Sequence, residues 1–219
     1  MDDKLYLFQS EIICLNYYDC NEPICAYTFG NIYYGPIECG DHNGTVDMQA
    51  SKAGFINYIY VNQALAKEYE ASPNTGCSNA LKIFDYTAIS QETIREIGPV
   101  CNPNFMVIER FGIAAYWRKK GLGVQILKGI IRQMKGKCGY IVILDPKPVL
   151  PGDDMENSYE DKGVDLTDLE RNPVTAQQKL NAFFRRCGFR TLKKYGNVFV
   201  CNVDQITEMG KKNAAFKVK

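Results

Sequence analysis

The chain has 219 residues, of which 46% are hydrophobic, and its formal net charge at pH 7 is +1. This length and composition suit one large domain with a substantial core. The near-neutral charge argues against nucleic acid as a partner and against attraction to an anionic membrane. The start of the chain lacks the basic residues and apolar run of a signal peptide, and no apolar stretch is long enough to span a bilayer. We therefore expect a soluble cytoplasmic protein.

The chain contains nine cysteines and one histidine. In a cytoplasmic protein we expect reduced thiols, several of them buried as small apolar side chains. A zinc site built from Cys20, Cys25, Cys39 and His42 is the alternative. Because the spacing of these four residues is irregular, we expect separate thiols and no bound metal.

Before residue 100 the pattern is weak, and it predicts short elements joined by turns. Residues 16–47 are rich in Gly, Asn, Asp and Tyr, which favours turns and short strands. The other elements expected in this half are a strand at 5–15, a strand at 55–61, a helix at 62–69 and a helix at 90–97 that Ser90 caps.

From residue 105 onward the pattern is clearer. The run at 140–144 is continuously apolar, as expected for a central strand that is covered on both faces. An acidic insertion follows at 146–172, and Asn172 with Pro173 forms a typical helix start. The remaining elements expected are a strand at 105–113, a helix at 122–135 and a hairpin of 189–193 with 197–203. This order predicts an α/β or α+β fold.

The segment Arg118-Lys-Lys-Gly-Leu-Gly123 lies between the expected strand at 105–113 and the expected helix at 122–135. A helix start presents unpaired backbone N–H groups and the positive end of the helix dipole. Glycines allow the backbone to approach a bulky anion, and three basic side chains add charge. The segment therefore suits a diphosphate, although its spacing matches neither a Walker loop nor a dinucleotide-binding loop.

The sequence from Phe111 to Gly123 resembles the fourth strand and the [Arg/Gln]-x-x-Gly-x-[Gly/Ala] loop of the GNAT superfamily of acyl-CoA N-acyltransferases. The later stretch from Phe184 to Phe189 resembles the family's junction between a helix and a strand. The resemblance covers roughly residues 104–203. It implies a GNAT-like domain over 1–203, with a C-terminal extension at 204–219. Its central mixed, mostly antiparallel sheet would have splayed fourth and fifth strands and flanking helices.

The resemblance also implies acetyl-CoA as a co-substrate. Its pantetheine arm would pair with the fourth strand like an extra strand, and the loop would hold its pyrophosphate. The residues expected to bind the coenzyme are Ile113, Ala114, Ala115, Arg118, Lys119, Lys120, Gly121, Leu122, Gly123, Val124, Gln177 and Phe184. The amine would then attack the thioester directly, without a covalent intermediate.

Glu109 and Tyr195 are the catalytic candidates. Glu109 lies an even number of residues before Ile113, on the same face of the expected strand, and could act as the base. The alternative for Glu109 is an ion pair or a solvated carboxylate. Many family members have Tyr where this chain has Phe184, so the acid that protonates the thiolate must come from elsewhere. Tyr195 and Tyr116 are the substitutes, although packing roles are an alternative for both.

The expected activity is transfer of an acetyl group to a primary amine of a small molecule or peptide. Two other functions remain open. One is a non-catalytic acyl-CoA-binding module, which the absence of a tyrosine at Phe184 favours. The other is an acetyltransferase that acts on aminoacyl-tRNA through a local basic patch. A homodimer is possible. The acidic insertion would either attract a cationic amine or form a solvated loop.

Overall fold

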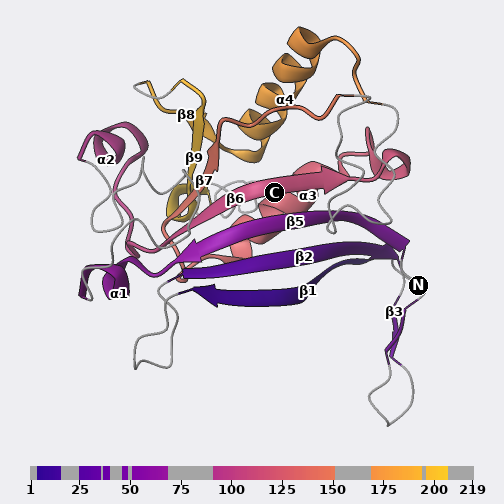
Figure 1. Cartoon of the computed structure of the whole chain (residues 1–219), viewed down its shortest axis with the longest axis horizontal. Helices are drawn as coiled ribbons and strands as arrows, with labels where there is room; N and C mark the ends of the chain where they lie inside the picture. Colours follow the sequence, from indigo (N-terminus) through magenta and orange to yellow (C-terminus); the bar gives the residue numbers. More distant parts are fainter. Residues whose placement is uncertain are drawn as a thin grey trace, which may run out of the picture.

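The computed structural model describes residues 4–15, 25–35, 37–39, 46–48, 51–68, 91–150, 169–193 and 196–206. Its strands form a seven-stranded sheet in the order β1-β2-β5-β6-β7-β9-β8 (Figure 1). The sheet is antiparallel except for the parallel pair β6 and β7. The strands are β1 (Lys4–Leu15), β2 (Cys25–Gly35), β5 (Ser51–Val61), β6 (Phe105–Ile113), β7 (Tyr140–Leu144), β8 (Arg190–Thr191) and β9 (Val198–Asn202). This arrangement confirms the predicted α/β fold with a mixed, mostly antiparallel sheet.

A separate two-stranded sheet pairs β3 (Ile37–Cys39) with β4 (Val46–Met48). The helices flank the large sheet, as Figure 1 shows. They are α1 (Gln63–Glu68), α2 (Gln91–Ile97), the 3-10 turn η2 (Ala115–Trp117), α3 (Leu122–Gln133) and α4 (Pro173–Cys187). In the described part of the chain, no helix is both long enough and apolar enough to cross a bilayer.

Two apolar clusters cover the two faces of the sheet. On β7, Ile141 and Ile143 pack with α3 and α4, whereas Tyr140 and Val142 pack with residues of α1 and α2. Side chains of a strand alternate between its faces, so a strand that is covered on both sides must be apolar throughout. This confirms the prediction made from the continuous apolar run.

The prediction of turns and short strands over residues 16–47 was wrong for β2. Residues 25–35 form a strand of 11 residues that pairs with β1 on one side and with β5 on the other. Its glycines and asparagine favour turns locally, but hydrogen bonds along both edges stabilise the extended backbone and override that preference. β5 also begins earlier than predicted, at Ser51.

The parallel strands β6 and β7 pair only along part of β6. Their register runs from Phe105 opposite Tyr140 to Ile108 opposite Ile143. β7 ends at Leu144, but β6 continues to Ile113 and stays paired with β5 on its other edge. The edge of β6 beyond Ile108 is thus not paired with β7, which places the expected splay between the fourth and fifth strands of the sheet.

Candidate functional site

The part of β6 beyond Ile108 presents a defined set of backbone groups toward the β7 side. Gly112 directs its carbonyl toward β5, where a Cβ on Gly54 would collide with it. The N–H of Ala114 donates to the carbonyl of Ala53 at 2.9 Å. Successive residues of a strand point their backbone groups to opposite edges. The N–H and carbonyl groups of Phe111 and Ile113 therefore face the β7 side.

This geometry changes which residues form the open edge. Ala114 and Ala115 were expected to provide it together with Ile113. The carbonyls of Ala114 and Ala115 instead accept from Trp117 and Arg118 at 2.9 and 3.1 Å within η2. The carbonyl of Ile113 accepts from Nε of Arg118 at 2.8 Å. The backbone of Phe111 and the N–H of Ile113 thus lie at the centre of the open edge, two residues earlier than the sequence suggested.

The loop after η2 directs the chain into α3 at the end of this edge. Lys119 and Gly121 both adopt positive φ, 61° and 77°. Gly121 is the N-cap of α3, and no described side chain caps this end of the helix. The first N–H groups of a helix have no acceptor within it, and the helix dipole makes this end positive. The N–H groups of residues 122–124 are therefore available to an anion, and Lys119, Lys120 and Gly121 are exposed beside them.

Gly123 is needed for packing. A Cβ at this position would lie 3.2 Å from the ring of Phe183 on α4 and 3.5 Å from Cγ1 of Ile113. The same Phe183 ring stacks on Phe111 with 5.9 Å between centroids. Gly123 thus allows the start of α3 to approach both β6 and α4. Phe111 and Phe183 were not among the predicted site residues, although Phe111 lies two residues before Ile113 on β6 and Phe183 directly precedes Phe184 on α4.

Glu109 lies where β6 and β7 diverge. It follows Ile108, the last residue of β6 that pairs with β7. It also occupies a bulge, because Arg110 pairs with Asn57 and Ile108 pairs with Tyr58. The side chain of Glu109 is exposed. The bulge interrupts the alternation of side chains, because Ile108 before it and Phe111 and Ile113 after it all pack on the cluster with α3 and α4. Simple alternation, from which the sequence placed Glu109 on the face of Ile113, therefore does not hold across this residue.

Phe184 lies in the core, with 4% of its surface exposed. It packs against Phe183, Phe189 and Phe199 at centroid distances of 5.3, 5.9 and 5.5 Å. Gln177, two turns earlier on α4, makes polar contacts instead. Its Nε2 donates to the carbonyl of Pro146 and to Oδ1 of Asn181, both at 2.9 Å. Of these residues, Phe183 directly contacts both the loop and β6.

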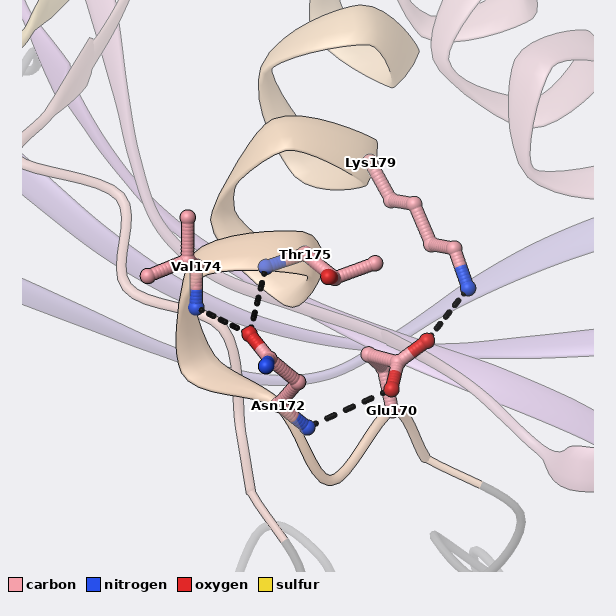
Figure 2. A network of polar contacts seen from close by, with 5 residues as sticks. All are labelled: Glu170, Asn172, Val174, Thr175 and Lys179. Carbon is pink, nitrogen blue, oxygen red and sulfur yellow. Dashed lines mark hydrogen bonds and ion pairs between the residues drawn. The ribbon is translucent and has the colours of Figure 1, made fainter.

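The start of α4 is fixed by the cap that the sequence predicted. Oδ1 of Asn172 accepts from the N–H groups of Val174 and Thr175, each at 3.0 Å (Figure 2). Figure 2 also shows Glu170 accepting from the N–H of Asn172 at 3.2 Å and from Nζ of Lys179 at 2.5 Å. The hydrogen bond from Lys179 is the main reason that the pKa of Glu170 lies below its usual value. These contacts connect the segment before α4 to its first two turns.

Several predicted positions lie outside the described residues. They include Tyr195, His42, Ser90 and most of the acidic insertion. Among the described cysteines, Cys25, Cys138, Cys187 and Cys201 are buried free thiols and Cys101 is exposed. In the described part of the chain, no group of three or more His, Cys, Asp or Glu side chains is placed to hold a metal ion.

Comparisons with known proteins place these observations in context. No family model and no curated protein matches the sequence. Among solved structures, a KacTA–DNA complex is 9% identical, covering 85% of this chain and 74% of that chain with a TM-score of 0.41. A tyrosine-to-phenylalanine mutant of KacT is 13% identical, covering 84% of this chain and 75% of that chain, with a TM-score of 0.41. Arabidopsis thaliana NAA60 in complex with acetyl-CoA is 9% identical. The match covers 79% of this chain and 76% of that chain, with a TM-score of 0.35.

Similarities at this level of identity and TM-score do not by themselves establish an activity for this chain. Its own strand order is more informative. The fourth and fifth strands of the sheet, β6 and β7, are the parallel pair, and α3 connects them. The glycine-containing loop opens α3 beside the point where these strands separate. The strand order, the separated parallel pair and this loop together give the chain a GNAT-like fold, as the family resemblance of its sequence predicted.

Proposed function

We propose that this protein is an acetyl-CoA-dependent N-acetyltransferase that transfers an acetyl group to a primary amine of a small molecule or peptide. One observation carries the proposal: the open edge of β6 at Phe111 and Ile113 leads directly to the N-terminus of α3. An extended amide chain attached to a diphosphate fits this pair of features. Pantetheine joined to the nucleotide of coenzyme A is such a molecule.

The two halves of the donor would use different groups. The pantetheine amides would pair with the backbone of Phe111 and Ile113, as a further strand pairs with a sheet edge. The diphosphate would accept hydrogen bonds from the N–H groups of residues 122–124 at the positive end of α3. The side chain of Lys119, exposed beside them, adds charge. Arg118 would act indirectly, because its Nε holds the carbonyl of Ile113.

The transfer itself needs few protein groups. The nitrogen lone pair of the neutral amine attacks the thioester carbonyl carbon, a C–N bond forms, and the C–S bond breaks as the thiolate leaves. A base must first remove a proton from the ammonium ion. Glu109 is the proposed base, because its exposed carboxylate lies where β6 and β7 diverge. Phe184 cannot return a proton to the thiolate, so Tyr195 or water is proposed for that step.

Calorimetric titration with acetyl-CoA tests the donor site. We expect saturable binding to the intact protein and its loss in Gly121→Glu, which places a carboxylate at the positive helix end. Gly136→Glu is a matched control. Gly136 has the same φ of 77° and the same open surroundings, but it lies beyond the other end of α3. If Gly121→Glu and Gly136→Glu bind acetyl-CoA equally well, the loop is not the donor site.

A second candidate function is an acyl-CoA-binding module without turnover. The observation that favours it is the burial of Phe184 among aromatic residues, because a phenylalanine side chain has no hydroxyl group that could act as the acid. An assay for free thiol over a broad panel of amines separates the two functions. Release of thiol above the hydrolysis background indicates the transferase, whereas binding without release indicates the module.

A further inference from the structure

Lys120 is held on a platform of aromatic rings beside the N-terminus of α3. Its Nζ lies 3.8 Å from the centroid of the Tyr116 ring and 5.1 Å from that of Trp117. The rings of Tyr116 and Trp117 pack edge to face with 4.9 Å between their centroids. The Trp117 ring packs in the same way on Tyr34 of β2, with 4.8 Å between centroids. The platform thus connects an exposed lysine to the sheet through three rings.

Tyr116 is unusual in its exposure. At 72% it is one of two exposed large hydrophobic residues in the described part of the chain. Its ring buries little surface, so core packing does not explain its position. A cation over an aromatic ring is stabilised by roughly 0.5–1 kcal/mol at an exposed site. The contact that the structure gives Tyr116, apart from its edge with Trp117, is the ammonium group of Lys120.

This arrangement prepares Lys120 to bind an anion. A free lysine side chain loses up to about 2 kcal/mol of rotamer entropy when it is fixed. A lysine that already rests on two rings loses less of this entropy when a ligand binds, so the contact is stronger. The charge remains accessible, because the side chain of Lys120 is exposed.

We propose that Lys120, positioned by Tyr116 and Trp117, binds the ribose 3′-phosphate of coenzyme A and so selects it over donors that lack this group. The inference rests on the proposed function. The N–H groups of residues 122–124 and the dipole of α3 already account for the diphosphate. Lys120 lies before this first turn, and its Nζ lies over the Tyr116 ring of η2. Of the phosphate groups of coenzyme A, the 3′-phosphate is the one left for it.

The test is a comparison of coenzyme A with 3′-dephospho-coenzyme A by calorimetric titration. We expect the wild-type protein to bind coenzyme A about tenfold more tightly, as one charge-assisted contact to a phosphate implies. Lys120→Met should bring the ratio of the two dissociation constants close to one, by weakening coenzyme A alone. Tyr116→Phe, which keeps the ring, should retain the ratio, and Tyr116→Ala should lower it. Lys135→Met, at the other end of α3, should leave it unchanged.

Four results would overturn the inference. If the wild-type protein binds both ligands equally, no group recognises the 3′-phosphate, although the proposed function stands. If Lys120→Met weakens both ligands by the same factor, Lys120 contacts the diphosphate instead. If Tyr116→Ala and Tyr116→Phe behave alike, the ring does not position the lysine. A wild-type protein that binds neither ligand contradicts the proposed function itself, and the inference fails with it.

Discussion

At the scale of single residues, the bulge at Glu109 is the most consequential feature of β6. A bulge inserts one unpaired residue into a strand and bends it locally. Here the extra residue comes directly after the last pair between β6 and β7. The bend and the end of the pairing coincide, and the residue at that position carries a carboxylate. The residue proposed as the base is therefore the one at which the open edge of β6 begins.

We predict that Glu109→Gln lowers kcat by at least about 100-fold, the lower range for the loss of a general base. The binding of acetyl-CoA should be unchanged, because the proposed donor contacts lie at Phe111 and beyond. Steady-state kinetics with an accepted amine, together with titration of the donor, measures both effects. Glu92→Gln, an exposed glutamate on α2, is the control. Unchanged kcat in Glu109→Gln would assign the deprotonation to another group.

At the scale of elements, α4 is fixed at both ends by local signals. Asn172 and Pro173 begin it, and Gly188, with a φ of 102°, ends it in the left-handed conformation that glycine favours. A Cβ at Gly188 would also collide with the side chain of Ile206. These end points set the bounds of the helix that carries Phe183, the residue that packs on Phe111 and Gly123.

We predict that Asn172→Ala lowers the free energy of unfolding by about 1 kcal/mol, the typical cost of losing an N-cap. Two backbone N–H groups, of Val174 and Thr175, would lose their acceptor. Asn172→Asp retains an acceptor and should unfold like the wild-type protein. Urea denaturation followed by circular dichroism measures the difference. Equal destabilisation by Ala and Asp would mean that the side-chain amide, rather than the cap, stabilises this end.

At the scale of the whole molecule, the cluster between the sheet and helices α3 and α4 unites distant segments. Three of its members are thiols: Cys138 before β7, Cys187 at the end of α4 and Cys201 on β9. Burial raises the pKa of Cys138 to about 12 and that of Cys187 to about 11, and it also raises the pKa of Cys201. These side chains thus pack as neutral apolar groups in the folded protein.

The raised pKa values predict a loss of stability at alkaline pH. A thiol whose pKa is raised by folding keeps its proton in the folded state while the unfolded chain releases it. The contribution of Cys138 and Cys187 to stability is therefore complete below about pH 9, near the ordinary thiol pKa of 9.0, and declines as the pH rises toward 11 and 12. Denaturation midpoints measured from pH 7 to 10.5 should fall above pH 9. A double Cys138→Ala, Cys187→Ala variant, although less stable overall, should show a weaker fall; an equal fall would assign the effect to other groups.

The sequence by itself determined the elements whose signals are local. The bounds of β6 and β7, the first residue of α3 and the cap of α4 were all predictable, because periodicity, glycine and proline act over a few neighbouring residues. The loop from Arg118 to Gly123 could be recognised for the same reason. Its position between a strand and a helix already indicated an anion site, and the resemblance indicated which anion.

Only the tertiary structure decided how these parts combine. β2 is a strand because β1 and β5 lie on both sides of it, and no local pattern records those partners. The open edge lies at Phe111 and Ile113 because Gly112 and Ala114 are directed to β5. Phe183 and the ring platform under Lys120 depend on contacts between residues far apart in the chain. Hydrogen bonds and ring contacts between residues far apart in the chain set these features. Local sequence patterns do not show which distant residues become neighbours in the fold.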